Sequence, residues 1–193
     1  MLHIRKLSFS YERKAVLDDF SLSVKQGEIV AVMGPSGCGK STLLNLIAGL
    51  KKPNAGTVEC NAKRISYAFQ EARLFPWMTV EENLLAVLSK QDEDALERIE
   101  NALSIVSLSD AKKLFPTELS GGMKSRASLA RALVYGGDLF LLDEPFSALD
   151  EQLRTSLATT LRKEFQKRGA TAIIVTHSLA EAEAMADRTV PLP

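Results

Sequence analysis

The chain has 193 residues, a length that suits one domain with at most a subdomain. Hydrophobic residues make up 46% and charged residues 25%, a composition typical of a globular protein and not of a disordered one. Lys+Arg and Asp+Glu both number 24, so the net charge is zero and gives no support to a nucleic-acid-binding function.

The apolar runs of the chain are short and argue against a membrane-spanning segment. None approaches the roughly 20 apolar residues that a transmembrane helix needs. The first residues lack the apolar core of a secretory signal. Because Cys38 lies in a glycine-rich loop, we expect Cys38 and Cys60 to be free thiols in a reducing cytosol. The protein is therefore expected to be cytoplasmic.

Short apolar runs separated by turns predict strands in the first part of the chain. The expected strands cover residues 2–11, 16–24, 29–33, 57–60 and 65–69. Tyr11 ends the first of them, and its ring could either stack on a base or belong to the core. His3 receives no role.

A glycine-rich loop follows the strand at 29–33. Its sequence, Gly34-Pro35-Ser36-Gly37-Cys38-Gly39-Lys40-Ser41, fits the phosphate-binding pattern G-x-x-x-x-G-K-[ST]. Backbone N–H groups and the dipole of the following helix would bind phosphate oxygens. Lys40 would reach the β- and γ-phosphates, and the Ser41 hydroxyl would bind Mg²⁺. A chance glycine-rich turn is the alternative, which the strand before the loop and the helix after it disfavour.

The middle of the chain predicts helices. Residues 76–118 carry helical signals and no strand signal, among them a capping-box spacing at Thr79 and a helical period over 96–106. We expect an inserted helical lobe there. Just before it, Gln70 ends an apolar strand and could either ligate Mg²⁺ or its water, or be a surface amide.

A second glycine pair opens a predicted helix. Ser120 has the character of an N-cap, and Gly121 and Gly122 leave the first N–H groups of the helix accessible to an anion. An isolated sequence of this kind would be an ordinary cap. Because the glycine-rich loop already serves the chain's own nucleotide, we expect this second site to contact the nucleotide of a partner subunit.

The last third alternates again between strands and helices. A strand at 139–142 delivers Asp143 and Glu144 at its carboxyl end, where ligands of open α/β sheets bind. Asp143 could hold Mg²⁺ through water, and Glu144 could orient or deprotonate an attacking water. His177 follows the strand Thr171–Thr176 and could donate a hydrogen bond to the γ-phosphate, although a lone histidine at a strand end is more often structural. Helices are expected over 153–165 and 178–185.

In these motifs the chain resembles the ATP-binding-cassette (ABC) ATPases. The resemblance covers nearly the whole sequence, and the motifs occur in the family's order: the P-loop, Gln70, the signature 119–123, the Walker B strand 139–144, the D-loop 147–150 and His177. It implies an α/β fold of the P-loop NTPase (RecA-like) class. That fold has a mostly parallel sheet, an antiparallel β subdomain and a helical lobe. In one domain of 193 residues, about 1–75 and 119–193 would form the core and about 76–118 the helical subdomain.

The resemblance also implies ATP and Mg²⁺ as ligands and assigns roles to residues. Catalytic roles fall to Glu144, His177 and Gln70, and the metal site to Ser41, Gln70 and Asp143. Tyr11 takes the place of the adenine-stacking aromatic. The nucleotide would contact Tyr11, Gly34, Pro35, Ser36, Gly37, Cys38, Gly39, Lys40, Ser41 and Thr42.

The same resemblance implies partners. Two copies would pack head to tail in an ATP-dependent homodimer, in which Ser120, Gly121 and Gly122 reach the partner's nucleotide and Asp150 lies at the interface. The segment 70–80 would receive transmembrane permease subunits, and it looks like that of bacterial importers for nitrate, sulfonates, taurine or thiamine. A solute-binding protein would complete the system, without nucleic acid. The subunit would lie peripherally on the inner face of the cell membrane.

Two departures and two alternatives accompany this interpretation. Met123 replaces the usual glutamine of the signature, so dimer closure or turnover is expected to differ in degree. The sequence ends at Pro193, where relatives continue with further strands, so the chain is either a minimal version or a truncated product. A non-transport ABC ATPase acting on nucleic acid or ribosomes is the alternative function. Another P-loop enzyme, such as a kinase, would leave the signature and D-loop unexplained.

Overall fold

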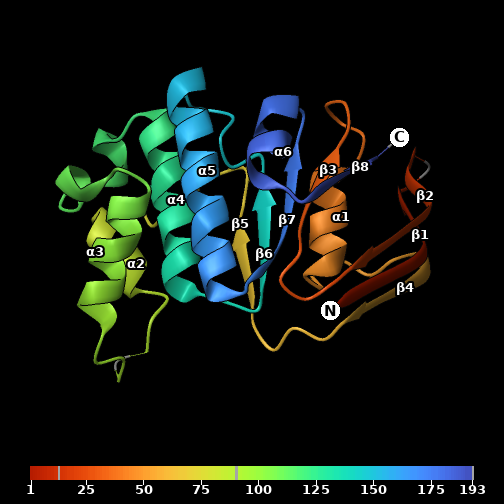
Figure 1. The fold of residues 1–193 in the computed structure, drawn as a ribbon, viewed down its shortest axis with the longest axis horizontal. Helices are drawn as coiled ribbons and strands as arrows, with labels where there is room; N and C mark the ends of the chain where they lie inside the picture. Colours follow the sequence, from red (N-terminus) through yellow and green to blue (C-terminus); the bar gives the residue numbers. More distant parts are fainter. Residues whose placement is uncertain (13, 90, 193) are drawn as a thin grey trace.

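A five-stranded parallel sheet in the order β5-β6-β7-β3-β8 forms the centre of the molecule (Figure 1). The structure is a computed structural model and describes residues 1–12, 14–89 and 91–192. The strands of this sheet are β3 (Ile29–Met33), β5 (Ile65–Ala68), β6 (Leu139–Asp143), β7 (Thr171–Thr176) and β8 (Arg188–Pro191). The three inner strands are almost entirely apolar and buried on both faces, as parallel strands covered by helices must be.

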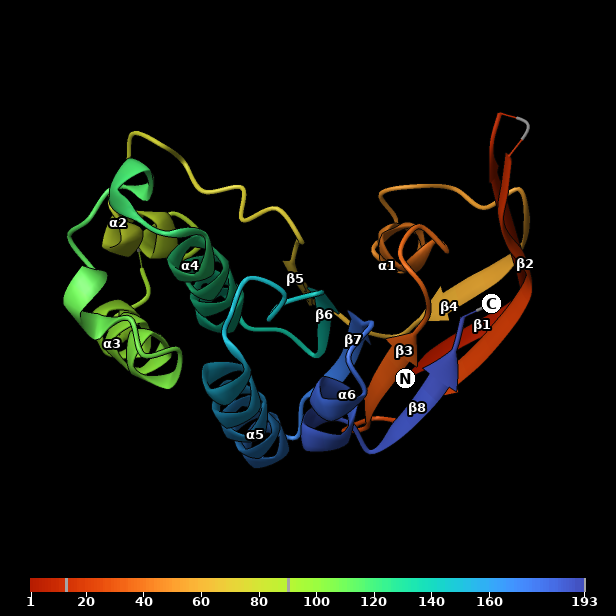
Figure 2. The same cartoon turned by 90° about the horizontal axis from the view of Figure 1, so that it is seen from above.

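The two faces of this sheet bury separate hydrophobic cores. On one face, residues such as Ala31, Leu142 and Ile174 pack under helices α4 (Gly121–Tyr135), α5 (Glu151–Arg168) and α6 (Leu179–Met185). On the other face, the alternate residues pack against helix α1 (Lys40–Ile47). Figure 2 shows the three helices on one side of the sheet and α1 on the other. Because the five strands run parallel to one another, they all present their carboxyl ends at the same end of the sheet, where α1 begins.

A three-stranded antiparallel sheet covers the outer side of α1. It consists of β1 (Leu2–Tyr11), β2 (Lys14–Val24) and β4 (Ala55–Cys60), in the order β2-β1-β4. Its inward side chains alternate with exposed ones along β1 and join the core around α1. This sheet brings Tyr11, at the end of β1, next to the start of α1, because the Tyr11 hydroxyl lies 3.3 Å from Oγ1 of Thr42.

The middle of the chain is helical. It contains α2 (Val80–Leu85), α3 (Ala95–Ile105) and the short 3-10 turns η1 (Ser109–Ala111) and η2 (Pro116–Glu118). Both helices contact α4 and lie at the end of the molecule away from the antiparallel sheet (Figure 1). Within the described part of this stretch, residues 69–138 contain no strand. Thr79 forms the expected capping box with Glu82.

The expected fold class is confirmed, and one element differs from the expectation. Strand β8 pairs in parallel with β3 at the edge of the sheet, where the sequence predicts no strand. Leu192, directly after β8, donates its amide to the carbonyl of Met33 and is buried. Among the described residues, no helix combines the length and apolar character that crossing a bilayer requires.

Candidate functional site

The glycine-rich loop joins the carboxyl end of β3 to the start of α1. Gly37 and Gly39 both adopt a positive φ, 80° and 104°, a conformation that glycine enters without strain. A side chain at position 39 would also collide with Val16, because its Cβ would lie 2.5 Å from Cγ1 of that residue. Lys40 is almost fully buried and donates from Nζ to the carbonyls of Gly34 and Pro35, both at 2.9 Å. The ammonium group is thereby held over the loop.

A cleft of about 300 Å³ opens over this loop. Its lining includes residues from four predicted motifs, because Tyr11, the loop, Gln70 and Glu144 all face it. Tyr11 is 45% exposed there, and Nζ of Lys51 lies 4.8 Å from the centre of its ring. Lys14 and Val16 also line the cleft. Neither residue was predicted from the sequence, and the signal that would have found them is their place next to Tyr11 in the same β-hairpin.

Asp143 and Ser41 meet at the floor of the site. The Ser41 hydroxyl donates to Oδ1 of Asp143 over 3.0 Å, and Asp143 is only 3% exposed. Burial raises the pKa of Asp143, and the neighbouring Glu144 carboxylate adds to that effect, whereas the hydrogen bond from Ser41 opposes it. Gln70 lines a small hollow together with these two residues. A buried carboxylate, a hydroxyl and an amide oxygen are the hard ligands that Mg²⁺ prefers, so the residues fit this ion.

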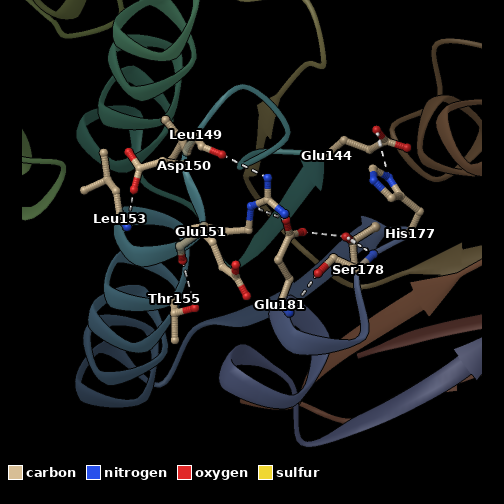
Figure 3. A network of polar contacts seen from close by, with 11 residues as sticks. Glu144, Leu149, Asp150, Glu151, Leu153, Thr155, His177, Ser178 and Glu181 are labelled. Atoms are coloured by element: carbon tan, nitrogen blue, oxygen red, sulfur yellow. Dashed lines mark hydrogen bonds and ion pairs between the residues drawn. The ribbon is translucent and has the colours of Figure 1, made fainter.

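Glu144 turns back toward the cleft at the end of β6. Its φ of 46° is unusual for a residue with a side chain, and its amide donates to the carbonyl of Val175. Oε1 lies 3.4 Å from Nζ of Lys40. Oε2 lies 3.5 Å from Nδ1 of His177, a contact that Figure 3 shows. Both predicted carboxylates therefore face one site, as expected from a turn at the strand end.

The predicted signature residues lie outside this cleft. Ser120 is the N-cap of α4 and accepts a hydrogen bond from the amide of Met123 at 3.2 Å. Ser120 and Gly121 are exposed, and neither lines the cleft. Gly122 packs against the D-loop, because a Cβ at this position would lie 2.9 Å from the carbonyl oxygen of Ala148. The chain alone does not bring the signature and its own P-loop together.

Asp150 and the two cysteines also lie at defined places in the fold. Asp150 caps α5 by accepting from the amide of Leu153 at 2.9 Å, and it is exposed (Figure 3). Cys38 and Cys60 are free thiols, as expected. Behind the D-loop, Arg154 and Glu181 form an ion pair that the sequence analysis missed. No sequence signal marks this pair, because its members lie on two different helices.

Comparison with known proteins places these features in a family. A family profile described as ABC transporter matches residues 17–147. The aliphatic sulfonates import ATP-binding protein SsuB of Bacillus subtilis (strain 168) is 41% identical over 190 residues, covering 94% of this chain and 74% of that protein. The aliphatic sulfonates import ATP-binding protein SsuB 1 of Streptomyces avermitilis is 45% identical over 184 residues, covering 95% of this chain and 70% of that protein.

Solved structures agree with this assignment. The dimeric structure of MJ0796, a bacterial ABC transporter cassette, superposes with a TM-score of 0.91 at 29% identity and covers 100% of this chain and 94% of that one. A post-hydrolysis state of the same ATP-binding cassette, with ADP and Pi, superposes with a TM-score of 0.89, at the same identity and coverage. Sequence, fold and order of motifs thus lead to one conclusion: the chain belongs to the ABC transporter family, as an ATP-binding cassette.

Proposed function

We propose that this chain binds ATP with Mg²⁺ in the cleft and hydrolyses it to drive a solute importer. The observation that carries the proposal is the position of Glu144, whose two oxygens lie 3.4 Å from Lys40 and 3.5 Å from His177. A base, a phosphate-binding cation and a hydrogen-bond donor thus surround the place where a γ-phosphate would lie. The import function of the relatives supports the direction of transport.

Each residue has a defined task in this proposal. Lys40 exchanges part of its contact with the loop carbonyls for the β- and γ-phosphates. Ser41, Asp143 and Gln70 would hold Mg²⁺, which when bound neutralises phosphate charge. Glu144 orients a water and accepts its proton as the water oxygen attacks the γ-phosphorus. The bond from that phosphorus to the ADP oxygen breaks, and His177 donates a hydrogen bond to the transferred phosphoryl group.

A second copy of the chain completes the site in this proposal. Ser120 and Gly121 are exposed, lie outside the chain's own cleft and begin a helix whose first N–H groups suit a phosphate. We infer that they contact the nucleotide of a partner copy, together with Gly122, and that Asp150 lies at this interface. The dimeric state of the MJ0796 cassette supports the arrangement.

A permease is proposed to dock beside the helical lobe. We assign the lobe to about residues 76–118, and the core to about residues 1–75 and 119–193. Trp77 is 70% exposed and Phe75 is also exposed, which is unusual for large aromatic side chains. Trp77 and Leu85 border a groove of about 470 Å³. An apolar helix of a permease would cover this groove, and the subunit would then lie peripherally on the inner face of the cell membrane, with a solute-binding protein outside it.

Hydrolysis is tested with the variant Glu144→Gln, which keeps the shape of the side chain and removes the base. We expect ATP binding to persist, turnover to fall by at least about 100-fold and a dimer to appear with ATP in light scattering after gel filtration. Glu59→Gln, an exposed carboxylate in an ion pair on β4, is the matched control and should leave both unchanged. Full turnover in Glu144→Gln would contradict the proposal.

The transport role needs a second measurement. The chain is expressed together with candidate permease subunits from the same genome, and recovery of the complex is measured for the wild type and for Trp77→Ser. We expect the wild type to be recovered with the permease and Trp77→Ser to lose it while still hydrolysing ATP. Recovery of ribosomal RNA or DNA in place of a permease would favour the non-transport alternative.

A further inference from the structure

We propose that Glu181 is a positioning residue that ties the turn carrying His177 to the D-loop (residues 147–150), so that both move as one unit. The proposal rests on the proposed function, because it assumes that His177 and Glu144 serve hydrolysis and that the D-loop faces a partner copy. Figure 3 shows the contacts that carry it, between the start of α5, the end of β7 and α6.

Glu181 is a buried carboxylate that forms one hydrogen bond and one ion pair. It is 3% exposed, and Oε2 accepts a hydrogen bond from the Thr176 hydroxyl. Oε1 lies 3.3 Å from Nε of Arg154, without the alignment of a hydrogen bond, so this contact is an ion pair. A carboxylate that is withdrawn from water in this way holds its partners firmly, since losing one would leave a buried charge uncompensated.

On one side, Glu181 fixes the turn around His177. The hydroxyl of Thr176 donates to Glu181 and accepts from the amide of Ser178 at 3.0 Å. The hydroxyl of Ser178 accepts from the amide of Glu181 at 3.4 Å. The residues before and after His177 are thus both bonded to Glu181, while the imidazole itself stays exposed and reaches Glu144.

On the other side, Arg154 fixes the D-loop. Its Nη2 donates to the carbonyl of Leu149 at 2.9 Å. Leu149 lies between Ala148, against which Gly122 packs, and Asp150, which caps α5. The contacts therefore run without interruption from the signature helix through the D-loop, Arg154 and Glu181 to the turn of His177. A displacement of the D-loop by a partner copy would be transmitted to the imidazole and, through it, to Glu144.

The P-loop meets this connection only at its last member, where Glu144 lies 3.4 Å from Lys40. Lys40, Ser41 and Thr42 lie on α1, on the opposite face of the parallel sheet from α5 and α6. Loss of the ion pair should consequently disturb turnover and leave ATP binding intact. A residue that only supported the fold would lower stability without separating kcat from KM in this way.

The test compares Arg154→Met, Glu181→Gln and the double variant of the full chain. We expect each single variant to lower kcat for ATP by about tenfold while KM changes by less than about twofold. The double variant should be no slower than the slower single variant, because both substitutions break one connection. Equal effects on kcat and KM, or multiplying effects in the double variant, would overturn the proposal.

Arg162→Met is the matched control. Arg162 also lies on α5, also donates to a carbonyl (Ala186, 2.6 Å) and also pairs with a carboxylate (Asp187, 2.7 Å), but it touches neither the D-loop nor the turn of His177. Because its partner Asp187 is more exposed than Glu181, Arg162→Met should lose less stability than Arg154→Met and keep kcat. A fall of kcat in Arg162→Met as large as that in Arg154→Met would assign the effect to stability alone.

Amide hydrogen exchange separates this inference from the proposed function. Among the described residues, Arg154 forms no hydrogen bond or ion pair with Thr176 or Ser178 and is joined to them through Glu181. Faster exchange of the Ser178 amide in Arg154→Met therefore reports transmission without any need for ATP. If the wild type hydrolyses ATP but Arg154→Met matches Arg162→Met in exchange and in kcat, the inference fails. If exchange is transmitted but the wild type hydrolyses no ATP, the proposed function fails.

Discussion

Nζ of Lys40 lies 3.4 Å from Oε1 of Glu144, so the cation that begins α1 faces the carboxylate that follows β6. The two residues are more than a hundred positions apart and meet because the carboxyl ends of β3 and β6 lie at the same edge of the parallel sheet. The same ammonium group donates to the backbone carbonyls of Gly34 and Pro35. Phosphate oxygens are stronger acceptors for a lysine than backbone carbonyls are.

Replacing Lys40 should therefore act on ATP binding before it acts on chemistry. We expect Lys40→Met to weaken ATP affinity by about 100-fold, because a charge-assisted contact to two phosphates is lost. Isothermal titration calorimetry with ATP and Mg²⁺ measures this directly. Lys52→Ala, which removes an exposed lysine from the segment between α1 and β4, is the control. Unchanged affinity in Lys40→Met would rule out the P-loop as the phosphate site.

Asp143 should show a conflict between stability and activity. Burial raises the pKa of this carboxyl, so its charged form costs free energy in the folded protein above the ordinary aspartate pKa of 3.8. Asp143→Asn removes the charge and keeps an acceptor for Ser41. Without nucleotide and Mg²⁺, we expect Tm at pH 7 to rise by about 2–4 °C.

The rise in Tm caused by Asp143→Asn should depend on pH and on the absence of Mg²⁺. As the pH falls through the raised pKa, the wild-type carboxyl becomes neutral in the folded state and the difference in Tm should shrink. The difference should disappear below pH 3.8, where the carboxyl is neutral in the unfolded chain as well. ATP hydrolysis with Mg²⁺ should meanwhile be lost in Asp143→Asn. Differential scanning calorimetry over a pH series, together with an ATPase assay, checks both. A lower Tm at pH 7 would show that the charge stabilises the site.

The site motifs could be recognised from sequence because each is local. A strand, a glycine-rich loop and a helix follow one another between Ile29 and Ile47, so their spacing alone predicts how the loop binds phosphate. The capping box at Thr79 is equally local. Glu144 was placed correctly because a residue that directly follows a buried strand has few directions in which to point.

The features that the sequence did not predict depend on contacts between distant segments. Strand β8 is short and contains Pro191, which lowers its strand signal, and it forms because the edge of β3 is open to it. The pair of Arg154 and Glu181 joins two helices whose own patterns say nothing about each other. Lys14 lines the cleft only because β2 folds back along β1. Such contacts follow from the sheet order, which a single sequence does not contain.

The two glycines of the signature should respond differently to alanine. A Cβ at Gly121 meets nothing within 4 Å, and alanine favours the first turn of a helix, so Gly121→Ala should keep or raise Tm. A Cβ at Gly122 would lie 2.9 Å from the backbone oxygen of Ala148 and 3.1 Å from Cδ2 of Leu149, so Gly122→Ala should lower Tm by a few degrees.

The shared-site proposal adds a second expectation for Gly121. In the background of Glu144→Gln, ATP should produce less dimer with Gly121→Ala, because the added methyl group would occupy the space that a partner's phosphate needs. Light scattering after gel filtration measures the dimer fraction. Wild-type dimerisation in a Gly121→Ala chain of unchanged Tm would show that this surface of the helix does not approach a nucleotide.

The edge of the parallel sheet should carry part of the acid sensitivity of the fold. Arg188 of β8 donates to Oε1 of Glu28 at 2.6 Å, and the amide of Lys25 donates to Oε2 at 2.7 Å. Burial alone would raise the pKa of Glu28, but these hydrogen bonds and the nearby positive charges together outweigh it and lower the pKa below 4.5. The charged form is thus favoured by folding.

A lowered pKa fixes the sign of the effect. Glu28 contributes stability above its ordinary pKa of 4.5, and this contribution is lost as the pH falls through the lowered pKa of the folded state. Glu28→Gln should therefore cost about 1 kcal/mol of unfolding free energy at pH 7 and almost nothing once the wild-type carboxyl is protonated. Urea denaturation over a pH series measures the difference. Glu59→Gln, whose pair with Arg5 is exposed, should cost far less at pH 7. A cost for Glu28→Gln that does not change with pH would show that packing at the sheet edge, and not the charge, is what Glu28 contributes.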